Sequence, residues 1–251
     1  MLPMMTIDIN CDMGEGIGDD EAIMPFISSA NIACGYHAGD NETMKKTVEL
    51  AIKNKVAIGA HPSFLDRENF GRTEIQLPGI EIYDLVVKQV YLLEEIARTA
   101  GVTLNHVKPH GALYNMAARD RNLANVITRA IKDVNEKLIV YGLSGSHLIH
   151  EAQTIGMRAA SEVFADRTYQ NDGSLTPRSQ PNALIEDEKQ AVQQALQMIT
   201  QKTVTTANGK MISIVADTIC IHGDGKHAVQ FAKAIKGKLK TEGIKIKSLI
   251  E

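Results

Sequence analysis

The chain has 251 residues, of which 44% are hydrophobic and 23% are charged, and its formal net charge is -3. This composition is typical of a single folded domain with a sizeable core and excludes a disordered chain, and no run of Lys and Arg with interleaved aromatic residues indicates binding to nucleic acid. No apolar run approaches the ~20 residues that a membrane span needs, and the opening segment is too short and uncharged for a signal peptide, so we expect a cytoplasmic protein without a membrane partner.

Seven short apolar segments, each ending on polar residues, predict seven β-strands. Between them lie segments with apolar residues at helical spacing and with capping residues, such as Asp40 at the start of one and Gly101 after the end of another. Residues 203–214 carry an Asn208-Gly209 turn between β-rich flanks and predict a hairpin. The strand segments are residues 6–12, 30–40, 56–62, 104–111, 138–144, 158–167 and 218–224, and the helical ones are residues 40–54, 81–100, 119–135, 146–155, 184–201 and 225–242.

This alternation of strands and helices predicts a parallel sheet with helices packed on it, because each crossover returns to the same end of the sheet. An open doubly wound sheet and a closed barrel both fit the pattern. Polar residues end almost every strand, whereas an open sheet concentrates its site at one switch point. We therefore favour an α/β fold with one domain, residues 1–251, that forms a seven-stranded (β/α) barrel similar to a TIM barrel.

The first strand places Asp8, Asn10 and Asp12 on one face, and Glu15 follows in a glycine-rich turn. Acids that face a barrel interior are costly unless they are paired. Two explanations stay open for this group. It is either a buried hydrogen-bond network that ties the end of the barrel together, or a site of metal coordination or general acid–base catalysis shared with histidines of neighbouring strands.

Histidines end the strands that follow. His37 and His61 are flanked by small residues that let a ligand approach, and several imidazoles at successive strand ends predict a functional cluster. After the fourth strand, Lys108 can hold a carboxylate, a phosphate or a developing oxyanion, or it can form a salt bridge with the barrel acids. His110 can transfer a proton or bind a metal ion, whereas His106 is expected to pack inside its strand.

Polar loops supply further candidates. Residues 162–178 form a long polar segment typical of a lid or a substrate-binding loop, and residues 70–72 form a similar, shorter loop. Residues 222–225 place glycines at a helix start and predict an anion nest. Arginine in such loops is suited to gripping a carboxylate or a phosphate. The candidate substrate-binding residues are Asn10, Glu15, Arg72, Lys108, Asp166, Arg167, Arg178, His222 and Asp224.

Taken together, the ordered motifs of the chain resemble those of the LamB/YcsF family over nearly the whole length. The resemblance implies a distorted seven-stranded (β/α) barrel related to glycoside hydrolase and deacetylase folds. It also implies the activity of the A subunit of 5-oxoprolinase, which is the ATP-dependent opening of 5-oxoproline to L-glutamate together with partner subunits B and C. The motifs are DINCDMGEG, SANIACGYHAGD, GAHPSF, FGR, KPHGALYN, EVFADRTYQNDGSLTPR and IHGD.

For this reaction we expect a catalytic group that orients water or handles protons, and basic residues that hold the substrate carboxylate or phosphate. ATP is the implied cofactor, but the chain contains no Walker A sequence, so a nucleotide would need another mode of binding. The catalytic candidates are Asp12, His37, His61 and His110, and the basic candidates are Arg72, Lys108, Arg167 and Arg178.

Two other functions stay open. The first is a stand-alone amide hydrolase or carbohydrate deacetylase, in which Asp12, His61 and His110 bind a divalent metal ion that activates water without ATP. The second is a non-catalytic subunit that lends a binding pocket to its partners. Metal analysis, an ATP-dependent turnover assay and alanine substitution at His61 and His110 distinguish the three functions.

Overall fold

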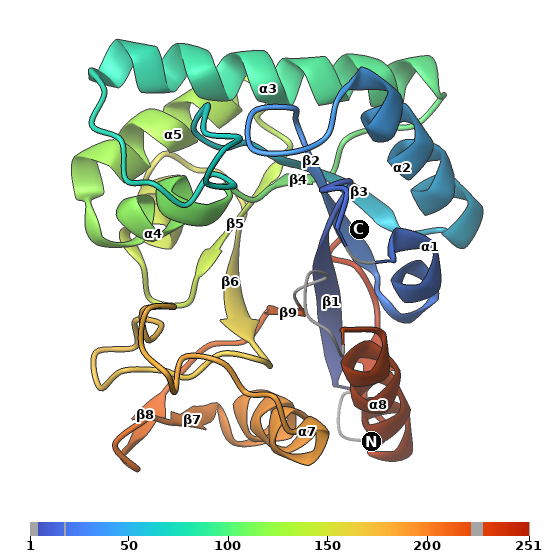
Figure 1. The fold of residues 1–251 in the computed structure, drawn as a ribbon, viewed down its shortest axis with the longest axis vertical. Helices are drawn as coiled ribbons and strands as arrows, with labels where there is room; N and C mark the ends of the chain where they lie inside the picture. The colour runs from blue at the N-terminus through green and yellow to red at the C-terminus, as the bar shows by residue number, and fades with distance from the viewer. Residues whose placement is uncertain (1–4, 18, 222–227, 251) are drawn as a thin grey trace.

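The computed structural model describes residues 5–17, 19–221 and 228–250, and a closed barrel of parallel strands lies at its centre (Figure 1). Seven strands follow one another around the barrel, and β1 pairs with both β2 and β9, which closes the sheet. The predicted seven-stranded barrel is confirmed, and the alternative of an open doubly wound sheet is wrong. The barrel strands are β1 (Thr6–Met13), β2 (Ser29–Ala33), β3 (Ala57–His61), β4 (His106–Val107), β5 (Ile139–Leu143), β6 (Ala159–Phe164) and β9 (Thr218–Cys220).

Helices surround the barrel and bury their apolar faces against its outer side (Figure 1). The Asp40 side chain caps α2 by accepting a hydrogen bond from the Thr43 amide at 2.8 Å, which explains this aspartate without any role in a site. Among the described residues, no helix is long and apolar enough to cross a membrane. The helices are α1 (Asp20–Ile23), η1 (Met24–Phe26), α2 (Asn41–Asn54), α3 (Gly79–Thr99), α4 (Gly111–Arg119), α5 (Arg121–Val134), α6 (His147–Thr154), α7 (Glu188–Leu196), η2 (Gln197–Gln201) and α8 (Ala228–Thr241).

The structure differs from the predicted elements in the segment after β4. The sequence pattern predicts a helix over residues 119–135 and none directly before it, but α4 begins at Gly111, and α5 starts as a separate helix at Arg121. Helix α4 forms because its apolar residues are buried at helical spacing, with Leu113 and Ala117 both inaccessible to solvent. This helix therefore brings a second set of side chains to the carboxyl end of the barrel.

The helix predicted over residues 184–201 begins later, at Glu188. Asp187 caps it by accepting a hydrogen bond from the Gln190 amide, while Leu184 pairs with Arg167 in the preceding loop. The predicted hairpin is confirmed as β7 (Thr203–Thr205) and β8 (Met211–Ser213), and a short β10 (Lys245–Ile246) extends the sheet beside β1.

Polar side chains fill the barrel interior, beginning at the amino-terminal ends of the strands. Asp8 is inaccessible to solvent and accepts hydrogen bonds from four hydroxyl groups, at 2.6 to 3.0 Å. These donors come from the start of β2, from β5 and from β9, so one carboxylate ties together strands from opposite sides of the barrel. The donors are Ser28, Ser29, Tyr141 and Thr218.

A second polar layer lies between Asp8 and the carboxyl ends of the strands. Asn31 donates a hydrogen bond to Asn10 at 2.8 Å and accepts one from His106 Nε2 at 2.8 Å. His106 stacks on Tyr141, as expected for a histidine packed inside its strand. A Cβ atom at Gly59 would lie 2.1 Å from the His106 ring, so the absence of a side chain there makes room for the imidazole.

Candidate active site

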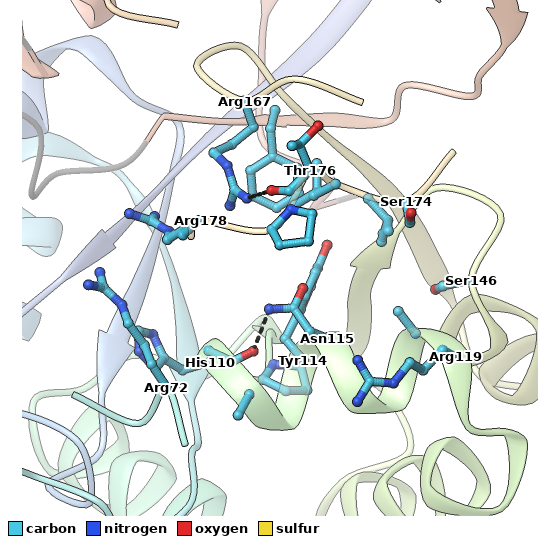
Figure 2. A pocket seen from close by; sticks show the side chains of 18 of the residues that line it. Arg72, His110, Tyr114, Asn115, Arg119, Ser146, Arg167, Ser174, Thr176 and Arg178 are labelled. Carbon is cyan, nitrogen blue, oxygen red and sulfur yellow. Dashed lines mark hydrogen bonds between the residues drawn. The ribbon is translucent and has the colours of Figure 1, made fainter. Parts of the chain in front are cut away.

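A cavity of about 750 Å³ opens at the carboxyl ends of the barrel strands (Figure 2). The buried side chains of Asp12, His61 and Lys108 line its inner part. Tyr114 and Asn115 of α4 form part of its wall (Figure 2). A pocket of this size and polarity is typical of a small-molecule site. The sequence-predicted residues that line it are Asp12, Glu15, His61, Arg72, Lys108, His110, Arg167 and Arg178.

Two histidines, His61 and His110, are in direct contact in the inner part of the cavity. His61 Nδ1 donates a hydrogen bond to the Lys108 carbonyl at 2.7 Å, and His110 Nε2 donates one to the Phe70 carbonyl at 2.9 Å. Because a carbonyl only accepts, these two bonds fix which ring nitrogen carries the proton. The other nitrogens, His61 Nε2 and His110 Nδ1, lie 2.9 Å apart. In the neutral rings both carry a lone pair, and two lone pairs at this distance repel each other.

His37 adds a third imidazole behind the other two and stacks on His110 with ring centres 3.8 Å apart. Ser63 donates its hydroxyl proton to the Phe64 carbonyl, so its oxygen accepts from His37 Nδ1 at 3.0 Å. The remaining nitrogen, His37 Nε2, faces Glu15 Oε1 at 3.0 Å.

His37 and His110 are neutral near pH 7. Burial, together with the neighbouring His61, lowers the pKa of His37 to about 2. Burial also holds the pKa of His110 well below its usual value, with His61 and His37 adding to the effect. The contact between His37 and Glu15 is therefore not an ion pair at neutral pH, and it places a lone pair against a carboxylate oxygen.

A cation would convert these repulsive contacts into attractive ones. One ligand atom each from Glu15, His37, His61 and His110 lies within 4.8 Å of all the others, and each histidine has its second nitrogen anchored by a protein oxygen. Such anchoring of the outer nitrogen is typical of histidine ligands. Of the sequence-predicted metal set of Asp12, His61 and His110, the two histidines belong to this group and Asp12 does not, while Glu15 and His37 complete it.

Asp12 is held by a different set of partners. Its Oδ1 accepts from Lys108 Nζ at 2.9 Å and from Asn31 at 2.8 Å, and its Oδ2 lies 3.4 Å from His61 Nε2. Asp12 thus links the histidine cluster to the buried lysine. Asp8 and Asn10 belong to a buried hydrogen-bond network, as in the first explanation for this group, whereas Asp12 reaches the cavity.

Lys108 is a buried cation between two carboxylates. Its Nζ lies 2.9 Å from Asp12 Oδ1 and 2.9 Å from Glu162 Oε1, and Glu162 Oε2 accepts a hydrogen bond from the Tyr114 hydroxyl at 2.6 Å. Burial by itself lowers the pKa of Lys108, but Asp12, Cys220 and Glu162 raise it well above its usual value, so the lysine stays charged. The salt bridge expected for Lys108 is present, and the lysine also lines the cavity.

Arginines lie farther out along the cavity wall. Arg72 and Arg178 appear on the same side in Figure 2, with Arg119 on the opposite side. Arg167 is buried and donates to the Thr176 carbonyl at 2.6 Å, which ties the long loop after β6 to itself. Burial and the like charge of Arg178 lower the pKa of Arg167 to about 10.

The remaining candidates lie apart from the cavity. Asn10 belongs to the polar layer beneath it and donates to Thr218 at 2.7 Å, and Asp166 is not among the residues that line it. His222 and Asp224 lie outside the described residues.

Comparison with known proteins assigns the chain to a family. The model of the LamB/YcsF family matches residues 7–251. This chain is a member of that family. It is 54% identical to a protein of Tolumonas auensis that is called the A subunit of 5-oxoprolinase, with 98% of this chain and 100% of the relative covered.

Solved structures agree with this assignment. A lactam utilization protein from Thermus thermophilus has the same fold with a TM-score of 0.92 at 38% identity, covering 98% of this chain and 100% of its own. A family 4 carbohydrate esterase from Streptomyces lividans is 11% identical with a TM-score of 0.52, covering 98% of this chain and 93% of its own. The second likeness confirms only the relation to deacetylase folds that the LamB/YcsF resemblance implies.

Four groups of this LamB/YcsF site were not predicted from the sequence as site residues. Glu162 had a visible signal, because an acid interrupts the otherwise apolar and small residues of β6. Tyr114 lies on a helix that was not predicted. Ser63 and Phe70 lie in the motifs GAHPSF and FGR, but the sequence does not show that the Ser63 hydroxyl and the Phe70 carbonyl form hydrogen bonds with His37 and His110.

Proposed function

We propose that this chain is the A subunit of an ATP-dependent 5-oxoprolinase, which opens the lactam of 5-oxoproline to L-glutamate in the cytoplasm together with subunits B and C. One observation carries the proposal: a relative called the A subunit of 5-oxoprolinase is 54% identical over 98% of the chain. The cavity supports it, because a buried cluster of carboxylates and imidazoles lies inside a wall that carries arginines. Such a layout suits a ligand with a reactive amide at one end and a carboxylate at the other.

The chemistry explains why ATP is needed. A lactam is an unreactive amide, so transfer of the γ-phosphoryl group of ATP to its oxygen, with release of ADP, makes the ring carbon accept water. The adduct then breaks its carbon–nitrogen bond while the nitrogen takes up a proton, which leaves an acyl phosphate. A second water hydrolyses this acyl phosphate to glutamate and inorganic phosphate. Two waters are consumed in total, one for the lactam and one for ATP.

The residues of the cavity fit the steps after phosphorylation. Asp12 is a carboxylate at the cavity with Oδ1 fixed by Lys108, so Oδ2 is oriented to take a proton from water. The charged Lys108 stabilises negative charge that develops nearby. Arg72 and Arg178 hold the substrate carboxylate or the phosphoryl group at the outer wall.

We also propose that Glu15, His37, His61 and His110 hold a divalent transition-metal ion, since neutral imidazole nitrogens and a carboxylate oxygen are donors that such ions prefer. A bound ion supplies Lewis acidity and activates water. Metal analysis of the purified protein tests this part: about one equivalent of a transition metal that is lost in a His61→Ala variant is expected. A protein that binds no metal after loading contradicts it.

The main proposal is tested by reconstitution. The chain is mixed with candidate B and C subunits, and glutamate release from 5-oxoproline is measured with and without ATP. We expect release only in the complete mixture with ATP, matched by formation of ADP. Glutamate formed by this chain alone without ATP overturns the proposal.

The histidine cluster favours one second candidate, a metal-dependent amide hydrolase that works without ATP. The same assay separates the two functions. A hydrolase of this kind releases glutamate from 5-oxoproline, or acetate from an acetylated sugar, when the metal-loaded chain is the only protein present.

A further inference from the structure

The loop between β3 and α3 contains a residue in an unfavourable backbone conformation next to the histidine cluster. Phe70 has a φ of 56°, in the left-handed region that side chains other than Gly, Asn and Asp rarely adopt. Its neighbours hold it there. The Asp66 carboxylate accepts from the Asn69 side chain at 2.9 Å and from the Thr73 amide at 3.0 Å, and the Asp66 carbonyl accepts from the Gly71 amide at 2.7 Å.

This conformation directs two successive carbonyl groups toward the start of α4. The Phe70 carbonyl accepts the proton of His110 Nε2 at 2.9 Å, and the Gly71 carbonyl accepts from the Ala112 amide at 2.9 Å. The fit is close, because a Cβ atom at Gly71 would lie 2.9 Å from the His110 ring and 2.9 Å from the Cβ atom of His37. The loop is thus fastened to both sides of His110.

The bond from His110 Nε2 decides what the other ring nitrogen can do. With Nε2 protonated, Nδ1 presents a lone pair 2.9 Å from His61 Nε2 and 3.3 Å from Glu15 Oε1. In the other tautomer Nδ1 would carry the proton and could not bind a cation. The acceptor at Nε2 in the described structure is a main-chain carbonyl, so the choice of tautomer depends on the position of that one group.

We infer that the Phe70 carbonyl sets the tautomer and orientation of His110, and that Asp66 is a positioning residue that holds Phe70 in the conformation this requires. The same turn also forms part of the outer wall of the cavity, because it contains Arg72. The guanidinium carbon of Arg72 lies 5.1 Å from the centre of the Phe70 ring. The position of a substrate-binding candidate and the proton of a cluster histidine therefore depend on the same loop. The inference rests on the proposed metal site only where metal affinity is measured.

The first test uses two substitutions of Phe70 with opposite effects on the backbone. Glycine adopts a positive φ readily, whereas valine is β-branched and disfavours it strongly. In metal-free protein labelled with ¹⁵N at histidine, the His110 resonances are assigned by their loss in His110→Asn. We expect Phe70→Gly to keep the Nε2-protonated tautomer although the ring is gone, and Phe70→Val to lose it. The opposite ranking, or no change in either variant, overturns the inference.

The second test uses Asp66. Asp66→Ala removes both side-chain hydrogen bonds of the turn, and Asp66→Asn can retain one of them. We expect the affinity for Zn²⁺, measured by competition with a chromophoric chelator, to fall by about 10- to 100-fold in Asp66→Ala and by less in Asp66→Asn, with a parallel loss of the His110 tautomer. Asp120→Ala is the matched control, because Asp120 also accepts from two amides but at the start of α5.

Different results would contradict the proposed metal site and the positioning role of Phe70 and Asp66. If the wild-type protein binds no Zn²⁺, the metal site is wrong, and the tautomer measured in metal-free protein still decides the role of Phe70 and Asp66. If Zn²⁺ binds and Asp66→Ala keeps both the tautomer and the affinity within twofold of wild type, the inference is wrong and the metal site stands. If the Zn²⁺ affinity of Asp66→Ala falls by no more than that of Asp120→Ala, Asp66 has a role in stability alone, and this result also overturns the inference.

Discussion

Two aspartates on β1, Asp8 and Asp12, point into the same barrel and have opposite surroundings. Asp8 is inaccessible to solvent, and hydroxyl groups donate to both of its oxygens at 2.6 to 3.0 Å. Asp12 lies at the cavity, with one oxygen held by Lys108 and Asn31 and the other 3.4 Å from a histidine nitrogen. The hydroxyls around Asp8 can rotate to donate or accept, whereas the groups around Asp12 have fixed roles.

This difference distinguishes the structural network around Asp8 from the candidate reactive group around Asp12 and the histidines. Around Asp8 every contact is attractive in the described structure. Around the histidine cluster, two contacts of 2.9 and 3.0 Å join groups that both present lone pairs when the imidazoles are neutral, His61 to His110 and His37 to Glu15. Native proteins keep such conflicts where a ligand, a proton or an ion removes them. The satisfaction of hydrogen-bonding groups, rather than the type of residue or the strand it belongs to, therefore distinguishes the surroundings of Asp8 from the histidine cluster.

Removing a cluster histidine should have the largest effect. We expect His61→Ala and His110→Ala each to lower ATP-dependent glutamate release in the reconstituted complex by about 10²- to 10⁴-fold, as for loss of a group that handles protons or binds a metal ion. The measurement is turnover at saturating 5-oxoproline, with circular dichroism to check the fold. The exposed His150, replaced by alanine, is the control. Full activity in both cluster variants would favour a non-catalytic binding subunit.

Breaking the pair between Lys108 and Glu162 should affect stability next. In Glu162→Gln one carboxylate opposite the buried ammonium is lost, while the Tyr114 hydroxyl keeps a partner. We expect the free energy of unfolding, measured in urea, to fall by about 3–5 kcal/mol, because a buried charge is left with less compensation. Tyr114→Phe is the matched control and should cost about 1 kcal/mol. Equal losses in the two variants would mean that the tyrosine hydrogen bond, and not the ion pair, matters.

The sequence predicted the barrel because seven short segments combine apolar residues with polar residues at their ends, and each of these segments overlaps one barrel strand. It missed α4 because His110 and Gly111 at the helix start look like a loop, and the apolar face of the helix is short. It extended α7 by four residues, from Glu188 back to Leu184, because Leu184 and Ile185 continue the apolar pattern although they pair with the preceding loop. Tertiary contacts, which local patterns do not record, decided both boundaries.

The histidines of the cluster were predictable because the carboxyl ends of parallel strands converge. The presence of Glu15, rather than Asp12, in the candidate metal-binding group was not predictable. Glu15 lies between Gly14 and Gly16, which have φ values of 70° and 73°, and this turn directs its side chain back toward His37. A glycine-rich turn permits many directions, so the sequence shows that a bend exists and does not show where it points.

The buried Asp8 carboxyl should make the free energy of unfolding depend on pH. Burial raises the pKa of Asp8, and this effect exceeds the lowering by its hydroxyl partners. The folded state then binds a proton more readily than the unfolded state, so stability is lost as the pH rises from 3.8, the usual pKa of an aspartate, toward the raised pKa of the folded state. The slope is up to about 1.4 kcal/mol per pH unit. The measurement is urea unfolding of wild type and Asp8→Asn across this range, and parallel curves for the two proteins would contradict it.

The smallest expected effect concerns substrate binding at the outer wall. Arg178 lines the cavity at an exposed position, so removing its charge should weaken binding of an anionic substrate without changing the chemical step. We expect Arg178→Ala to raise KM for 5-oxoproline about fivefold, or ~1 kcal/mol, with kcat within twofold of wild type. Arg119→Ala is the matched control, because Arg119 is an arginine that lines the same cavity on the opposite side in Figure 2 and pairs with Glu74 at 2.5 Å. An equal rise in KM for both variants would mean that the arginines act only through the general positive potential of the wall, whereas a rise in Arg178→Ala alone places the substrate carboxylate on the side of the cavity where Figure 2 shows Arg178.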